Sequence, residues 1–147
     1  MLAWRRAAAP LLARVAVAAA PVRSRAQAAA LLRAWPRRRA AAAAAGGVDP
    51  EVERVADFLA AEPYTMLDVR TAEEFASGSL PGAVNVPLQE LADRLNEIPR
   101  GAPLAVFCAA GVRSKVACQY LQQQGFRAED CINVPVVSAA LRELASE

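Results

Sequence analysis

Hydrophobic and polar positions alternate with two different periods along residues 49–147. Short, almost wholly apolar runs have the length of buried strands, and they cover residues 64–69, 83–86, 104–107 and 131–134. Apolar residues recur at helical spacing between these runs, in a stretch that opens at Asp49-Pro50 and in residues 87–98, 111–124 and 136–145. The alternation predicts a parallel sheet covered by helices on both faces.

Local signals agree with this division of the chain. Thr71 is followed three positions later by Glu74, which predicts a capping box at the start of a short helix. Pro87 suits a first helical position, and Leu88, Leu91, Leu95 and Ile98 would form the buried face of that helix. Gly125 suits the end of the helix that begins at residue 111.

Charge separates residues 1–48 from the rest of the chain. They contain nine of the 17 basic residues, all arginine, and no acidic residue. The other eight basic residues and all 15 acidic residues lie in 49–147, so that part carries a net charge of −7. An arginine-rich segment without acidic residues is typical of an organelle transit peptide. We therefore expect a transit peptide over 1–48, unstructured or helical, and one folded domain over 49–147.

Other functions for residues 1–48 fit the sequence less well. Arg14 interrupts the apolar stretch that a secretory signal needs, and no uncharged run approaches the ~20 residues of a membrane span. Alanine dominates where a nucleic-acid-binding arm would mix lysine with polar residues. We expect no nucleic-acid partner and no stable membrane insertion. The single leader serine, Ser24, favours the mitochondrial matrix, with the chloroplast stroma as the alternative.

The chain contains no histidine and three cysteines. Without histidine, Ser-His-Asp and Cys-His catalysis and HExxH metal sites are excluded. Cys108, Cys118 and Cys131 are too few and too scattered for a disulfide framework or a four-cysteine zinc site. We expect no metal and no cofactor.

Cys108 stands where a parallel α/β sheet places ligands, beyond the carboxyl end of a strand. It begins a loop through Gly111 that enters a helix, so successive N–H groups can form an anion-binding nest. Such a site favours the thiolate and lowers the pKa of a cysteine without an imidazole base. The alternative is a small hydrophobic residue that ends a strand.

Several motifs in this order resemble the rhodanese homology domain. They are Leu67-Asp68-Val69-Arg70, Glu74-Phe75, the run from Gly78 to Pro87, and the loop from Cys108 to Ser114, which is similar to the C-x-x-G-x-R-S active loop of that family. The resemblance covers roughly residues 50–134. It implies a parallel five-stranded sheet flanked by helices and transfer of sulfane sulfur through a cysteine persulfide.

The resemblance also implies a role for each site residue. Cys108 would be the nucleophile and persulfide carrier, and Asp68 and Arg70 would brace the active loop. The persulfide-binding loop would comprise Ala109, Ala110, Gly111, Val112, Arg113 and Ser114. Arg113, with Lys115, would hold an anionic donor, or Arg113 would instead turn away to bind a carboxylate. Ser114 would cap the following helix or take part in catalysis.

These roles imply a sulfurtransferase that takes sulfur from thiosulfate, another small donor or a protein persulfide and passes it to cyanide or a thiol. The alternative is a sulfur-carrier or interaction module with little turnover on small donors. Arg113 follows Cys108 by five positions, whereas the loops of phosphatases and arsenate reductases are one residue longer. The shorter loop suits a single sulfur atom better than a tetrahedral oxyanion.

The sequence departs from the family at three places. Ala109 and Ala110 stand where a basic residue is frequent, which weakens the expectation of thiosulfate. Ser79 stands where the family commonly has histidine, and residues 133–138 replace a Gly-Gly turn. Cys118 shares a line with Val112, Val116 and Leu121 that partly faces the core, so we expect it, like Cys131, to be a packing residue.

Overall fold

The computed structural model describes residues 49–146, and the predicted targeting segment over 1–48 lies outside them. The elements in chain order are α2 (Pro50–Ala61), β1 (Thr65–Asp68), α3 (Ala72–Ala76), β2 (Val84–Asn85), η1 (Leu88–Glu90), η2 (Leu95–Glu97), β3 (Leu104–Cys108), α4 (Val112–Gln123), β4 (Ala128–Asn133) and α5 (Val134–Ser146). The elements η1 and η2 are short 3₁₀ turns. None of the helices in residues 49–146 is long and apolar enough to cross a membrane.

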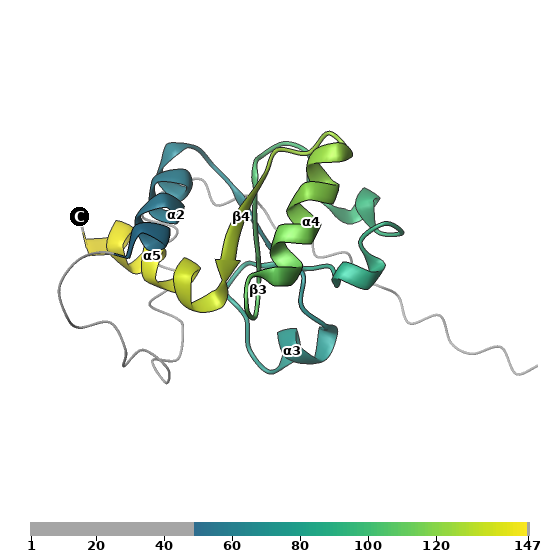
Figure 1. The fold of residues 1–147 in the computed structure, drawn as a ribbon, viewed down its shortest axis with the longest axis horizontal. Helices are drawn as coiled ribbons and strands as arrows, with labels where there is room; N and C mark the ends of the chain where they lie inside the picture. Colours follow the sequence, from purple (N-terminus) through teal and green to yellow (C-terminus); the bar gives the residue numbers. More distant parts are fainter. Residues whose placement is uncertain (1–48, 147) are drawn as a thin grey trace, which may run out of the picture.

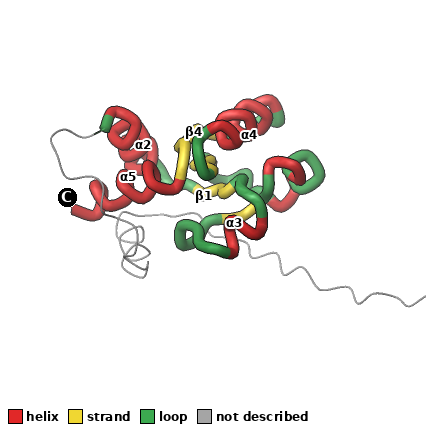
Figure 2. The backbone as a smooth tube through the Cα atoms, turned by 60° about the horizontal axis from the view of Figure 1, so that its bottom comes forward, coloured by secondary structure: helices red, strands yellow, loops and turns green. Residues whose placement is uncertain are grey.

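The described strands form one parallel sheet in the order β2-β1-β3-β4. Helices α2 and α5 pack together on one side of the sheet, and α4 packs against β3 and β4 on the other side (Figures 1 and 2). The carboxyl ends of all four strands therefore lie at the same end of the sheet, at the bottom of Figure 1. This confirms the predicted parallel α/β architecture.

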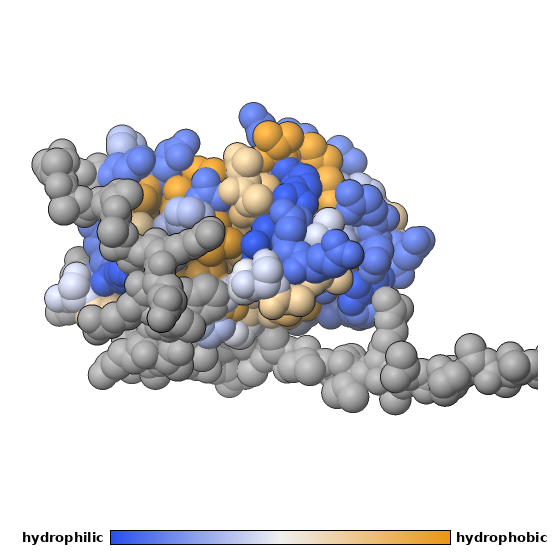
Figure 3. Space-filling model, turned by 90° about the horizontal axis from the view of Figure 1, so that it is seen from below, coloured by the Kyte–Doolittle hydropathy of each residue, from blue (hydrophilic) through white to orange (hydrophobic). Residues whose placement is uncertain are grey.

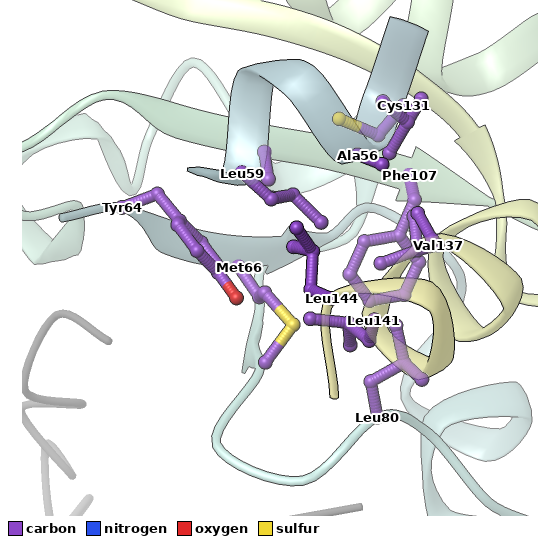
Figure 4. Close-up of a cluster of buried hydrophobic side chains, with 13 residues drawn as sticks. Ala56, Leu59, Tyr64, Met66, Leu80, Phe107, Cys131, Val137, Leu141 and Leu144 are labelled. Carbon is purple, nitrogen blue, oxygen red and sulfur yellow. The ribbon is translucent and has the colours of Figure 1, made fainter. Parts of the chain in front are cut away.

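The two central strands, β1 and β3, are buried along their whole length. Burial on both faces explains why β3 is wholly apolar, whereas β1 also contains Thr65 and Asp68. Successive side chains point to opposite faces. Met66 and Phe107 pack with Leu141 and Leu144 under α2 and α5 (Figure 4). The side chains that alternate with them join the second core beneath α4; these are Leu67, Val69, Leu104, Val106 and Cys108. The same alternation that builds the two cores directs the Cys108 side chain toward α4.

The expected five-stranded sheet is wrong within the described residues, where the sheet has four strands. The four apolar runs of the sequence supply all four strands, and the remaining apolar residues of 49–146 belong to helices or turns. The fifth strand was implied by the resemblance alone, and no further apolar run is left to form it.

The single helix expected over 87–98 is also wrong. Two short 3₁₀ turns, η1 and η2, replace it, because Arg94 adopts non-helical backbone angles of φ −115° and ψ 18° between them. Hydrogen bonds tie the Arg94 guanidinium to both Glu90 and Glu97. Leu91 and Ile98 nevertheless reach the core, since turns of about three residues keep that spacing on one side.

The capping signals are confirmed. The side chain of Asp49 accepts a hydrogen bond from the Glu51 amide at the start of α2. The Thr71 hydroxyl accepts one from the Glu74 amide, while the Glu74 carboxylate accepts one from the Thr71 amide. This capping box fixes α3 and, with it, the position of the Glu74 carboxylate.

Leu121 provides a test of the core beneath α4, because its side chain is fully buried there. We expect Leu121→Ala to lower the free energy of unfolding by about 2–5 kcal/mol through lost packing and a residual cavity. The matched control is Val116→Ala in the same helix, where the side chain is exposed and the expected change is about 0.5 kcal/mol or less. Denaturant unfolding measures the free energy of unfolding of both variants. Equal losses would contradict the assignment of Leu121 to the buried face of α4 and of Val116 to its exposed face.

Candidate active site

Cys108 ends β3, and α4 begins four residues later at Val112. The intervening loop lies at the carboxyl end of the parallel sheet, where α/β folds bind ligands. Helix α3 lies at the same end (Figure 1). The structure therefore brings together the loop from Cys108 to Ser114 and the segment that follows β1, as expected from the sequence.

The sulfur of Cys108 sits at the floor of this loop. The residue is only 1% exposed, and its Sγ atom accepts a hydrogen bond from the Gly111 amide at 3.0 Å. As a thiol, it is also placed to donate to the Ile132 carbonyl oxygen, 3.6 Å away. The Gly111 amide is one of the donors that the expected nest of amides would supply.

Opposing effects act on the pKa of Cys108, and the net result is a lowered pKa. Burial raises it, and this is the largest single effect. Hydrogen bonds from the Ser114 backbone and hydroxyl and from the Ala110 and Gly111 amides together outweigh burial. The Ser114 hydroxyl is also placed to donate to the carbonyls of Gly111 and Ile132, at 3.1 Å each.

Two residues with left-handed backbone angles shape the loop. Gly111 has a φ of +89°, and Ile132 has a φ of +66°, the only positive value at a non-glycine residue in the described chain. They touch, since a Cβ built on Gly111 would lie 2.8 Å from the Ile132 Cγ2 atom. Left-handed angles are uncommon for a β-branched residue, and such conformations concentrate at functional sites. Sequence reasoning missed Ile132, which carries no motif signal.

The Arg113 guanidinium turns to a carboxylate, one of its two expected alternatives. Its Nη1 and Nη2 atoms donate to the two oxygens of Glu74 at 2.6 and 2.9 Å. The Arg113 hydrogen bonds lower the pKa of Glu74 to about 2, aided by the Thr71 amide. Hydrogen bonding to Glu74 raises the pKa of Arg113 in turn. The pair links α3 to the first turn of α4 beside the sulfur.

Asp68 and Arg70 form a buried polar cluster at the end of β1. The Arg70 side chain donates to the fully buried Asp68 carboxylate, with a closest contact of 2.8 Å, and also to the Gly78 carbonyl at 2.8 Å. Ser79 donates a 2.5 Å hydrogen bond to Asp68. These contacts hold the segment around 78–79 rather than the loop itself; Asp68 reaches that loop through pairing of β1 with β3.

Apolar residues are exposed in the loop and at the start of α4. Ala109 and Ala110 are exposed, and Val112 and Val116 are exposed by 71% and 51%. The expectation that these two valines partly face the core is wrong, because α4 buries the face that carries Ser114, Ala117, Cys118 and Leu121. Viewed from the carboxyl end of the sheet, the surface carries apolar areas next to strongly hydrophilic ones (Figure 3).

Cys118 and Cys131 are packing residues in this structure. Cys131 is fully buried in the core beneath α2 and α5, on the opposite face of the sheet from Cys108, and burial raises its pKa. Cys118 donates to the Ala128 carbonyl, whose strand partner is Leu104 at the far end of β3. Burial and the nearby Asp130 raise the pKa of Cys118 to about 11.

Within residues 49–146, no group of three or more histidine, cysteine, aspartate or glutamate residues is arranged to hold a metal ion.

Residues 51–135 match the sequence profile of the rhodanese-like domain. The chain belongs to the rhodanese-like family. This confirms the resemblance drawn from the motifs and places Cys108 to Ser114 within the matched region. The roles expected for the individual loop residues stay predictions.

Relatives in this family include proteins named for sulfur transfer. A sulfurtransferase of Allochromatium vinosum is 38% identical over 74 residues, which cover 50% of this chain and 66% of that protein. The thiosulfate sulfurtransferase GlpE of Shewanella oneidensis is 32% identical over 75 residues, 51% of this chain and 74% of that protein. The solved structure of a rhodanese with anions from E. coli is 26% identical, with a TM-score of 0.46 over 50% of this chain and 89% of that one.

Gly111 provides a test of the loop geometry. We expect Gly111→Ala to destabilise the fold by about 1–3 kcal/mol and to raise the pKa of Cys108, since a left-handed angle and contact with Ile132 force the Gly111 amide away from the sulfur. Denaturant unfolding and the pH dependence of alkylation at Cys108 measure the two effects.

The control is Gly125→Ala, which also needs a left-handed angle, φ +83°, but has nothing within 4 Å of the added Cβ. It lies beyond the C-terminal end of α4, away from Cys108. We expect backbone strain alone and an unchanged Cys108 pKa. Equal effects of the two variants on this pKa would contradict the loop account.

Proposed function

We propose that the protein is a sulfurtransferase that carries sulfane sulfur as a persulfide on Cys108 and passes it to a thiol or to cyanide. The observation that carries this proposal is the buried Cys108 sulfur, which accepts the Gly111 amide at 3.0 Å and has a lowered pKa without any histidine. Membership of the rhodanese-like family and relatives named as sulfurtransferases support it.

The proposed reaction needs only groups that the loop provides. The Cys108 thiolate attacks the outer sulfur of the donor, a new S–S bond forms, and the donor's remaining group leaves with the electrons of the broken bond. The new outer sulfur is then transferred to an acceptor thiolate or cyanide, and the Cys108 thiolate is regenerated. Backbone N–H donors stabilise the anionic sulfur at both ends of the cycle.

Intact mass after incubation with a sulfur donor tests the nucleophile. Wild-type protein should gain one sulfur atom, and addition of cyanide should remove it with release of thiocyanate. Cys108→Ser should gain none, whereas Cys118→Ser should behave as wild type because Cys118 is buried with a raised pKa. A sulfur adduct that persists in Cys108→Ser would contradict the assignment.

A second candidate is a sulfur carrier or interaction module with little turnover on small donors. The observation that favours it is the ion pair of Arg113, whose two Nη atoms each donate to the Glu74 carboxylate. A stable Cys108 persulfide combined with slow thiocyanate release from thiosulfate would support this second candidate. Rapid multiple turnover would exclude it.

We also propose that residues 1–48 direct the protein to an organelle, the mitochondrial matrix first and the chloroplast stroma as the alternative. The support is compositional, namely nine arginines and no acidic residue in this segment.

Fusion of residues 1–48 to a fluorescent reporter tests the targeting proposal. The reporter should colocalise with a matrix marker, and replacement of the nine arginines by glutamine should leave it diffuse because import depends on positive charge. A diffuse signal from the unaltered fusion would contradict the proposal.

A further inference from the structure

The charged groups around the loop disfavour binding of a dianionic donor. The part of the chain after residue 48 has a net charge of −7, and Arg113 is bound on both Nη atoms by Glu74. The pair is only partly exposed, with 29% of the Arg113 side chain and 35% of the Glu74 side chain accessible. An incoming anion therefore meets a neutralised ion pair beside Cys108 rather than a free guanidinium.

Glu74 is held in place by more than the ion pair. Its carboxylate also accepts the Thr71 amide at 3.0 Å and so completes the capping box of α3. An anionic donor would have to displace a carboxylate that is already anchored on the helix opposite the loop. Lys115 is the other cation in the segment from Cys108 to Gln123, and it lies on the exposed surface of α4.

The start of α4, which directly follows the loop, exposes apolar side chains. Val112 and Val116 are the exposed large hydrophobic residues of the described chain. They are four positions apart in the first turns of α4, so they share one face. Ala109 and Ala110, which lie in the loop itself, are exposed as well. A donor with an apolar group next to its sulfane sulfur could cover these side chains while the sulfur reaches Cys108.

We propose that Glu74 determines donor specificity by neutralising Arg113, and that the site takes sulfur from organic donors with an apolar group, such as alkyl or aryl persulfides, in preference to thiosulfate. This inference rests on the sulfur-transfer function proposed above. The transfer balances without an oxidant: the Cys108 thiolate and R–S–SH give the Cys108 persulfide and the thiolate R–S⁻.

Two donors with the same reacting bond differ in both charge and apolar surface, and the variants described below separate the two effects. Thiosulfate is a dianion with sulfite as its leaving group, and benzenethiosulfonate is a monoanion that carries a phenyl ring, with benzenesulfinate as its leaving group. Steady-state KM and kcat are measured for each with cyanide as acceptor, together with the sulfur gained by Cys108 in intact mass. Wild-type protein should show a lower KM for benzenethiosulfonate than for thiosulfate.

Glu74→Gln removes the negative charge while its amide oxygen can still accept the Thr71 amide. We expect the KM for thiosulfate to fall by about threefold to tenfold, the range for a released charge-assisted contact at a partly exposed site, with little change in kcat. The KM for benzenethiosulfonate should change less. Addition of Arg113→Gln to this variant should abolish the gain, which a merely structural role of Glu74 would not predict.

Val116→Ser tests the apolar contact, and we expect it to raise the KM for benzenethiosulfonate more than the KM for thiosulfate. The control is Glu62→Gln. Glu62 pairs with Arg127 in the same way, but at the opposite end of the sheet, so both KM values should stay unchanged. Unfolding curves check that each variant is folded.

The results distinguish this inference from the function on which it rests. If Cys108 gains sulfur but wild type prefers thiosulfate, or if Glu74→Gln leaves the ratio of the two KM values unchanged, the specificity proposal is wrong and the sulfurtransferase proposal stands. If Cys108 gains sulfur from neither donor, both proposals are wrong.

Discussion

The hydrogen bond from the Gly111 amide to the Cys108 sulfur is the contact on which the rest of the site depends. It exists because β3 ends at Cys108, α4 starts at Val112, and the residue between them with a left-handed backbone is glycine. Ile132, itself left-handed at the end of β4, packs directly against Gly111 and directs its carbonyl toward Cys108 and Ser114. The loop and the end of β4 thus hold each other in place. Hydrogen-bond donors, rather than a neighbouring base, offset the effect of burial on the pKa of Cys108.

The charges around this loop are compensated locally. Asp68 is paired with Arg70 and Ser79 at the end of β1, and Glu74 is paired with Arg113 between α3 and α4. The first group of contacts holds residues 78–79 against the end of β1, and the second joins α3 to α4. Both lie at the carboxyl end of the sheet. The exposed residues of the loop and of the start of α4 include alanines and valines. The proposed donor preference rests on this combination of paired charges and exposed apolar side chains.

Sequence reasoning worked where a local signal has one structural meaning. The apolar runs predict the four strands, the Thr71–Glu74 spacing predicts the capping box, and the Cys108 loop is identifiable by its motif. It failed where the outcome depends on distant contacts. The left-handed angle of Ile132, which lies against Gly111, has no local signal. The sequence left two alternatives open for Arg113, because its partner Glu74 lies 39 positions away on another element.

The remaining errors have the same physical origin. Leu88, Leu91, Leu95 and Ile98 have helical spacing, but backbone angles at Arg94 divide the segment into two 3₁₀ turns that present the same side to the core. Val112 and Val116 are apolar at helical spacing yet lie on the exposed face of α4. Periodicity identifies a stripe of apolar residues, and only the packed structure decides whether that stripe is core or surface.

The most direct test of the account is the rate of Cys108 alkylation by iodoacetamide as a function of pH, followed at the Cys108 peptide by mass spectrometry. Because the thiolate is the reactive form, the rate reports the pKa of this thiol. The account predicts a midpoint below the ordinary thiol pKa of about 8.5, and a higher midpoint in Ser114→Ala, which removes one donor to the sulfur. A wild-type midpoint at or above the ordinary value would contradict activation of Cys108 by the loop.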